Sequence, residues 1–166
     1  MGPGEPGFDP RSETADSQHA TPVSLRARAL KLLARRDYSY AELERRLAPY
    51  AADAGELAAL LEDLQRVGFL SDLRLAEQVV RKGAARYGAR RIAEQLDERG
   101  VRRELAGQLK GELQASELRR ARAVWAKRFG RLPSDLRERG RQARFLEQRG
   151  FDPEVIRRVL RGAWEE

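Results

Sequence analysis

The stretch RRDYSYAELERRL (residues 35–47) is followed by GFLSD (residues 68–72) and, near the end of the chain, by EQRGFDPEVIRRVL (residues 147–160). Together they show a recurring pattern, in which a helix ends at Gly plus an apolar residue and a newly capped helix begins. Comparable segments close at Leu47, Leu96 and Leu146, which are spaced 49 and 50 residues apart. Recurrence at this period predicts a repeat architecture, in which one helical module occurs three times in tandem.

The composition predicts an all-α protein. Charged residues make up 36% of the chain and aromatic residues only 7%, and the abundant Ala, Leu, Arg and Glu favour helices over strands. A hydrophobic content of 41% in 166 residues supplies a modest core, which fits an elongated body better than one large globule. We therefore expect an elongated tandem array of three three-helix repeats, preceded by a disordered N-terminal tail.

The expected tail, residues 1–23, is rich in Gly, Pro, Ser, Thr and acids. It has too few large apolar residues to offset the entropy cost of ordering. His19, the single histidine of the chain, falls in this tail, which argues against a catalytic or metal-binding histidine. The three repeats are expected at residues 24–71, 72–115 and 116–166.

Capping residues mark the expected helix ends. Ser39 and Glu42 form a Ser-x-x-Glu capping box, in which the carboxylate reaches back to the cap nitrogen. Candidate N-caps of later helices are Ser71 or Asp72, Ser116, and Asp152 followed by Pro153 at the first helical position. The expected helix terminators are Gly68, Gly100 and Gly150.

Several classes of site and location are disfavoured by the residues present. The chain contains no cysteine, which excludes disulfides, thiolate metal sites and a cysteine nucleophile and suits a reducing cytoplasm. No apolar run approaches the roughly 20 residues of a membrane span. The carboxylates are mixed with Arg on outward faces, and no histidine accompanies them. We expect a cytoplasmic protein that is not an enzyme and has no cofactor or metal.

The net charge of +7 is distributed unevenly. Residues 37–72 contain three basic and eight acidic side chains, residues 73–103 nine and four, and residues 119–149 eleven and three. The first module is thus acidic overall and the later two are basic. This asymmetry suggests that a polyanion or an acidic protein surface faces the second and third modules.

The order of several short motifs between residues 25 and 161 resembles the RecX family. GFLSD is followed by LRLAE, YGARRIAEQLDERGV, VWAKRFG and RFLEQRGFDPEVIRRVLR, and no single motif is specific although their order is. The landmarks are Gly68, Phe69, Leu70, Ser71, Asp72, Arg74, Tyr87, Gly88, Arg91, Ile92, Leu96, Gly100, Val101, Trp125, Lys127, Phe129, Arg144, Phe145, Leu146, Arg149, Gly150 and Phe151. The chain departs from the family in Leu75, where an aromatic is usual, in the turn at residues 52–55, and in the acidic tail.

The resemblance implies a function that composition would not reveal. RecX proteins regulate the RecA recombinase by binding RecA and its nucleoprotein filament and inhibiting strand exchange, ATP hydrolysis and co-protease activity. The family would place this chain in DNA repair and recombination, with RecA as its partner. Single- or double-stranded DNA is a further candidate partner, and no membrane is implied.

Two basic clusters are candidate contact surfaces for DNA phosphates or acidic groups on RecA. The first is Arg81, Lys82, Arg86, Arg90 and Arg91, around Tyr87 as a possible stacking residue, with Arg74 upstream. The second is Arg119, Arg122, Lys127, Arg137, Arg141 and Arg144, in runs that also contain Arg120 and Arg139. The alternatives are a solvated helical face, or pairing of the second cluster with Glu138 and Glu147. The apolar spacing of Trp125, Phe129, Phe145 and Phe151 favours core packing.

A helical DNA-binding protein or transcription factor is the rival hypothesis, because three-helix units superficially resemble helix-turn-helix folds. Such a factor usually presents one recognition helix and acts as a symmetric dimer, whereas this module is repeated within one chain. Sequence preference among unrelated duplexes would support the rival.

Overall fold

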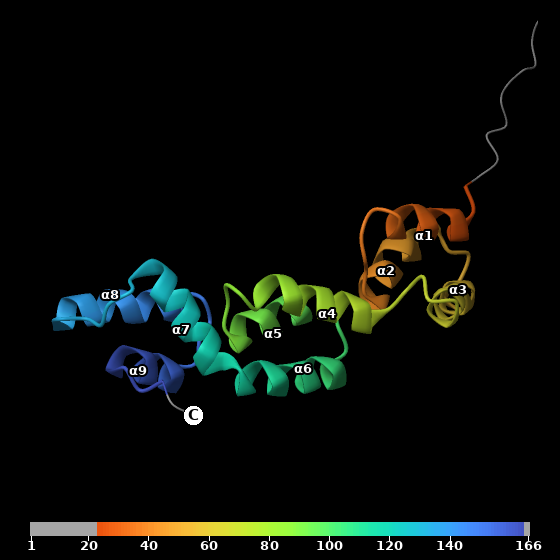
Figure 1. The fold of residues 1–166 in the computed structure, drawn as a ribbon. Helices are drawn as coiled ribbons and strands as arrows, with labels where there is room; N and C mark the ends of the chain where they lie inside the picture. Colours follow the sequence, from red (N-terminus) through yellow and green to blue (C-terminus); the bar gives the residue numbers. More distant parts are fainter. Residues whose placement is uncertain (1–22, 165–166) are drawn as a thin grey trace, which may run out of the picture.

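The computed structural model describes residues 23–164, and every regular element in this range is helical, which confirms the all-α prediction (Figure 1). The elements are α1 (Leu25–Leu33), α2 (Tyr40–Leu47), the short 3-10 helix η1 (Ala48–Tyr50), α3 (Ala54–Arg66), α4 (Asp72–Gly83), α5 (Ala89–Glu98), α6 (Arg103–Ala115), α7 (Glu117–Arg128), α8 (Leu136–Glu147) and α9 (Pro153–Arg161). The predicted tail and His19 lie outside the described residues, apart from Val23.

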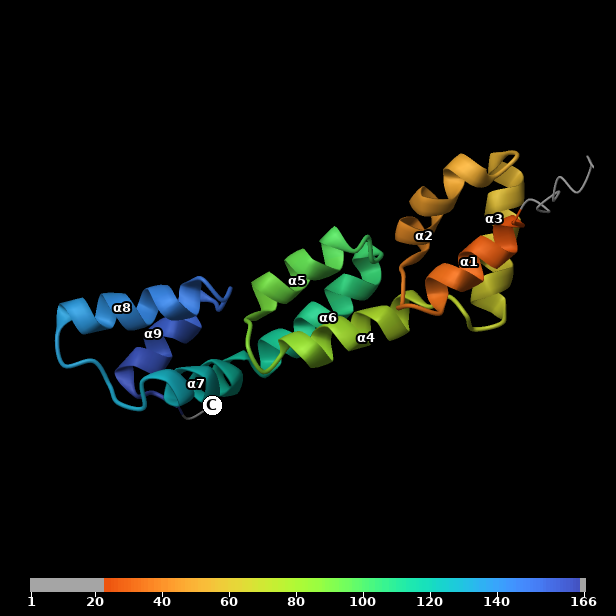
Figure 2. The same ribbon diagram turned by 90° about the horizontal axis from the view of Figure 1, so that it is seen from above.

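Three helical bundles follow one another along an elongated molecule (Figures 1 and 2). Helices α1–α3, α4–α6 and α7–α9 pack mainly within their own triplet, and each triplet encloses a separate hydrophobic core. Within residues 23–164 no core cluster crosses from one bundle to the next. Hydrophobic burial therefore stabilises each repeat, and other contacts must fix how the repeats are arranged. We propose residues 24–71, 72–115 and 116–166 as the repeats, because these boundaries fall where α4 and α7 begin.

The capping predictions are confirmed in part. Ser39, Ser71 and Asp152 each accept a backbone N–H at the start of their helix, as predicted. The Ser116 hydroxyl instead donates back to the carbonyls of Glu112 and Leu113, because α6 ends directly before it and leaves these groups free. Gly68, Gly100 and Gly150 take positive φ angles at helix ends, as expected of terminators.

Gly88 lets repeats 2 and 3 approach at the backbone. Its N–H donates to the carbonyl oxygen of Arg149 at 2.8 Å. A Cβ added at Gly88 would lie 2.2 Å from the carbonyl oxygen of Gly150, and one added at Gly150 would lie 2.6 Å from the Cβ of Arg91. Side chains at either glycine would force the two repeats apart.

Glu117, the first residue of α7, joins the same two repeats through a buried carboxylate. The side chain is 3% exposed, and one oxygen accepts the backbone N–H of Ala89 at 3.0 Å and that of Asp152 at 3.3 Å. Ala89 begins α5, where the N–H groups have no acceptor within the helix. The carboxylate therefore caps a helix of the preceding repeat and meets the positive end of its dipole.

The junction between repeats 1 and 2 is built the same way. Asp72, the first residue of α4, accepts the N–H of Tyr40 at the start of α2 at 2.7 Å. The Ser39 hydroxyl donates to the carbonyl of Arg99, and a Cβ at Gly100 would come within 3.2 Å of α2. In both junctions a carboxylate at the start of one repeat, Asp72 or Glu117, caps the middle helix of the repeat before it. A glycine that ends the middle helix of the later repeat, Gly100 or Gly150, approaches the same helix.

An ion-pair network surrounds the first junction and explains why the predicted capping box does not close. Glu42 is engaged by Arg36, and it also accepts from Arg99 at 3.4 Å instead of reaching back to the cap nitrogen. The hydrogen bond from Arg36, with help from Arg99, holds the pKa of Glu42 below its ordinary 4.5. Asp37 accepts from Arg74 at 2.9 Å and, through its backbone carbonyl, from Arg99 at 3.0 Å.

Gly88→Ala should destabilise the chain, because the new methyl group would meet backbone that cannot move without opening the junction. We expect a loss of about 1–3 kcal/mol in the free energy of unfolding, measured by urea denaturation followed by circular dichroism. Gly107→Ala is the matched control, because it lies within α6 with nothing within 4 Å of the added Cβ. It should stabilise by about 0.5–1 kcal/mol. Equal stability of the two variants would contradict the account.

Glu42→Gln should lower stability at pH 7 by about 0.5–1.5 kcal/mol. The pKa of Glu42 is lower in the folded chain, so its ionised form stabilises the fold above pH 4.5, and that contribution is lost as the pH falls through the lowered pKa. The difference between wild type and variant should therefore shrink in urea titrations below pH 4.5. Glu44→Gln, an exposed position on the same helix, serves as the control and should change stability little at either pH.

Candidate partner-binding surface

A groove between repeats 2 and 3 brings together three of the predicted contact residues. Arg86 and Tyr87 come from the turn after α4, and Lys127 comes from the end of α7; the groove has a volume of about 550 Å³. We call it the inter-repeat groove. Its larger lining side chains are Arg86, Tyr87, Arg120, Val124, Lys127, Arg128, Phe145 and Arg149.

The inter-repeat groove has an apolar floor and a cationic rim. The guanidinium of Arg149 lies 3.7 Å from the ring centroid of Phe145, and that of Arg86 lies 5.5 Å from the ring centroid of Tyr87. Within residues 23–164, Arg86, Lys127 and Arg128 form no ion pair with a carboxylate. The rim therefore carries uncompensated positive charge, which favours an anionic partner that also presents apolar groups.

Arg120 supports the groove from beneath. Its guanidinium donates to the carbonyl oxygens of Tyr87 at 2.6 Å, Leu113 at 2.8 Å and Ala84 at 3.3 Å. Burial lowers the pKa of Arg120, although Glu117 nearby opposes this effect. Because its donors are used on three carbonyls of repeat 2, Arg120 fixes the turn that carries Arg86 and Tyr87.

A second hollow continues the surface toward α8. It shares Arg128 and Phe145 with the inter-repeat groove and adds Arg131 and the predicted Arg141, with a volume of about 350 Å³. Glu138 accepts from Arg131 at 2.8 Å and lies 3.9 Å from Arg141, so the predicted pairing with Glu138 occurs here. These two arginines are partly neutralised, whereas Arg128 is not.

The other predicted cations lie outside the inter-repeat groove. Arg74 donates to Asp37 and to the carbonyls of Gly68 and Phe69, so it closes the turn before α4. Arg90 donates to the carbonyl of Glu147 at 3.1 Å, Arg91 pairs with Glu94 at 3.1 Å, and the guanidinium of Arg122 lies 4.2 Å from the ring of Trp164. The remaining predicted cations, all exposed, are Arg81, Lys82, Arg119, Arg137 and Arg144.

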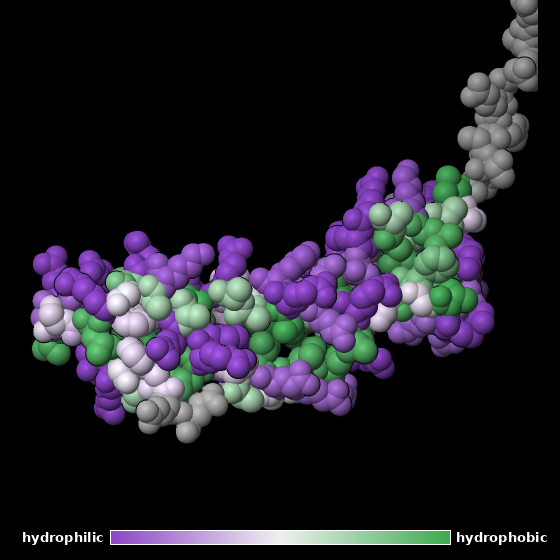
Figure 3. Space-filling model, viewed as in Figure 1, coloured by the Kyte–Doolittle hydropathy of each residue, from purple (hydrophilic) through white to green (hydrophobic). Residues whose placement is uncertain are grey.

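The four aromatic residues predicted to pack in the core do so, whereas Tyr87, the predicted stacking residue, is half-buried and packs against the core of repeat 2. Trp125 and Phe151 are buried in the core of repeat 3, and Phe129 and Phe145 pack against it. Phe69, in the turn between repeats 1 and 2, is 52% exposed. In Figure 3 hydrophobic residues, in green, gather over repeat 1 and the middle of the molecule, on a surface that is otherwise largely hydrophilic.

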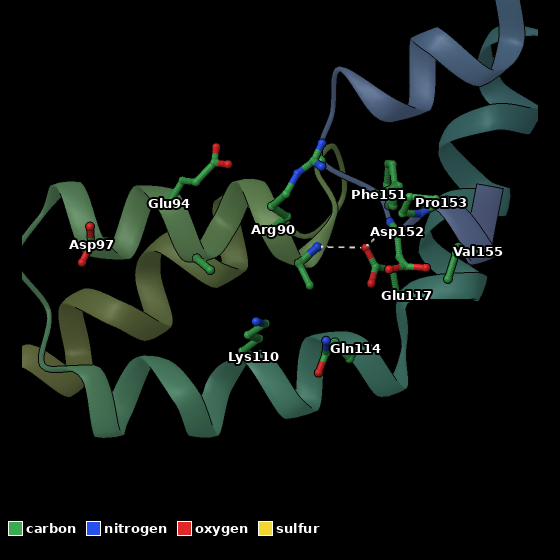
Figure 4. A pocket seen from close by; sticks show the side chains of 13 residues that line it. Arg90, Glu94, Asp97, Lys110, Gln114, Glu117, Phe151, Asp152, Pro153 and Val155 are labelled. Atoms are coloured by element: carbon green, nitrogen blue, oxygen red, sulfur yellow. Dashed lines mark hydrogen bonds between the residues drawn. The ribbon is translucent and has the colours of Figure 1, made fainter. Parts of the chain in front are cut away.

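A separate cleft is lined by α5, α6 and the start of α9 (Figure 4). Its volume is about 600 Å³, and Glu94 and Asp97 on α5 lie across from Lys110 and Gln114 on α6 (Figure 4). The cleft carries charges of both signs. It is thus less suited to a polyanion than the inter-repeat groove.

Residues 23–164 contain neither a cluster of metal-binding side chains nor a helix suited to a membrane. This range holds no group of three or more His, Cys, Asp or Glu side chains that could bind a metal ion. None of its helices is long and apolar enough to cross a membrane.

Sequence reasoning missed Glu117 and Arg128, and it named Arg149 only as a landmark of the family resemblance and not as a contact residue. Glu117 lies 45 residues after Asp72, at the equivalent place in the next repeat, so aligning the repeats at their first helical residues would have revealed it. Nothing local in the sequence distinguishes Arg128 and Arg149 from neighbouring cations. Only the approach of α4, α7 and α8 brings them together.

Comparisons with known proteins identify the chain's relatives. The family model "RecX, third three-helix domain" matches residues 115–160. "Regulatory protein RecX" of Ralstonia nicotianae is 47% identical over 142 residues, which cover 86% of this chain and 89% of that protein. The same-named protein of Leptothrix cholodnii is 48% identical over 139 residues, covering 84% and 88%. The crystal structure of RecX from Lactobacillus salivarius has a TM-score of 0.71 at 17% identity, covering 84% and 94%.

Arg120→Gln should destabilise the chain by about 1–3 kcal/mol, because it leaves buried carbonyls without their charged donor. The adjacent Arg119→Gln removes the same charge from an exposed position and should stay within about 0.5 kcal/mol of wild type. Parallel urea denaturation of the two variants measures both effects. Similar losses from both substitutions would show that Arg120 does not hold the turn.

Proposed function

The chain belongs to the RecX family of regulatory proteins, and from this membership we propose that it binds RecA and RecA–DNA filaments in the cytoplasm. There it inhibits the recombinase, ATPase and co-protease activities of RecA and so modulates DNA repair and recombination. It acts by binding and catalyses no reaction itself.

The observation that carries this proposal is the similarity to proteins named "Regulatory protein RecX" along most of the chain. Identity of 47% over 86% of the chain includes all three repeats, so the similarity is not confined to one three-helix unit. A regulatory role is stated in the names of these relatives. The link to RecA comes from the family resemblance that the ordered motifs imply.

The inter-repeat groove supports a physical mechanism for the proposal. A cationic rim steers an anionic surface toward the chain, and the apolar floor between Val124 and Phe145 can then bury apolar side chains of the partner. An elongated array suits a partner that is itself a long filament, because successive repeats can contact successive positions along it. Binding should weaken with salt, since exposed charges are screened.

The proposal is tested by RecA's ATP hydrolysis on single-stranded DNA, with the chain added at substoichiometric amounts after filaments have formed. We expect a progressive fall in the hydrolysis rate, with no fall for heat-denatured chain. An unchanged rate at stoichiometric excess would contradict the proposed function and favour the DNA-binding rival.

The groove's contribution is tested with Arg86→Gln, Lys127→Gln and Arg128→Gln combined. We expect at least a tenfold higher concentration for half-maximal inhibition of the RecA ATPase, because three uncompensated rim charges are lost. The control combines Arg66→Gln, Arg103→Gln and Arg157→Gln, which removes the same net charge from exposed positions elsewhere. Equal inhibition by the two triple variants would remove the groove from the mechanism.

A further inference from the structure

The surface of repeat 1 is less acidic than its composition suggests. Of the eight carboxylates in residues 37–72, six are engaged within the fold, either by arginine side chains or by backbone N–H groups. They are Asp37, Glu42, Asp53, Glu56, Asp63 and Asp72. Their charges are largely balanced or directed inward, so the net charge of the repeat does not describe what it presents to solvent.

A hollow between α1 and α2 presents the opposite charge. Arg28, Lys31, Arg35 and Arg46 line it around an apolar base, and its volume is about 310 Å³. The ring of Tyr50 at its edge is 57% exposed, and the guanidinium of Arg28 lies 4.2 Å from the ring centroid. Within residues 23–164 none of these four cations forms an ion pair with a carboxylate. We call this surface the α1–α2 hollow.

We propose that the α1–α2 hollow is a binding site for the chain's own acidic amino-terminal segment, residues 1–22. This segment carries Glu5, Asp9, Glu13 and Asp16 against a single basic side chain, Arg11. The segment thus supplies four carboxylates, which equals the number of cations in the hollow that have no carboxylate partner within residues 23–164. The charges are complementary, and both sets belong to the same molecule.

The point of attachment places this hollow within reach of the segment. The segment joins the fold just before Ser24, the N-cap of α1, and Lys31 lies about 10 Å farther along the helix axis. The residues between Asp16 and Ser24 can span up to about 27 Å, so Asp16 and Glu13 can both reach the hollow. The inter-repeat groove is lined by the turn after α4 and by residues of repeat 3, and α7 and α8 lie at the far end of the array from α1 (Figure 2).

Tethering makes weak pairs effective. Covalent attachment over a short stretch of chain holds the carboxylates at an effective concentration in the millimolar range, although each exposed ion pair is individually weak and screened by salt. The contact should therefore be salt-sensitive. While it lasts, the segment covers the hollow, and any other polyanion must displace it to bind there.

The proposal is tested by paramagnetic relaxation enhancement in the full chain. The sequence has no cysteine, so Ser12→Cys gives one site for a nitroxide label. At low salt we expect broadening of the backbone amides of residues 28–35 and 46–50, with little effect on repeat 3. The broadening should fall at least threefold at about 0.5 M salt, where screening is strong.

Two variants of the labelled chain make the outcome decisive. Glu5→Gln, Asp9→Asn, Glu13→Gln and Asp16→Asn combined give the background expected from tethering alone. Lys31→Gln, Arg35→Gln and Arg46→Gln combined remove three of the four cations, and circular dichroism confirms that each variant is folded. Broadening equal to wild type in either variant, or broadening centred on the inter-repeat groove, would overturn the proposal.

Discussion

The arrangement of the whole molecule depends on a carboxylate that reaches across a repeat boundary. Asp72 and Glu117 each begin a repeat and each accept the first N–H of the middle helix in the repeat before it. The three hydrophobic cores are separate, so burial of apolar surface cannot set the angle between neighbours. A buried carboxylate that satisfies a helix terminus can set that angle, because hydrogen bonds are directional and an unsatisfied partner is costly.

The inter-repeat groove is a consequence of the second junction. Its residues come from both sides of the boundary, and the contact of Gly88 with Gly150 and the donors of Arg120 hold the two sides in place. A partner that binds the groove therefore senses the junction geometry and not only the charge of one helix. This gives the repeat architecture a role in the proposed regulation of RecA, because the binding surface exists only when adjacent repeats are correctly docked.

Local features were predictable from the sequence, and features that depend on contacts between repeats were not. Helix periodicity, the caps at Ser39 and Asp152, and the terminating glycines are decided by neighbouring residues. The capping box predicted at Glu42 does not form, because Arg36 and Arg99 bind its carboxylate instead. The net charge of repeat 1 was likewise a poor guide to its surface charge, because a count of charged residues does not distinguish carboxylates engaged within the fold from free ones. The inter-repeat groove escaped prediction in part because Arg128 and Arg149 meet Arg86 only through packing.

Hydrogen exchange of the chain, alone and bound to RecA filaments on single-stranded DNA, tests the central claim most directly. The account predicts protection on binding in the turn at residues 84–88 and at the end of α7, residues 124–129, with little change in α6. Loss of this protection in the Gly88→Ala variant would tie it to the junction. Protection confined to the cleft between α5 and α6, or none anywhere in repeats 2 and 3, would contradict the account.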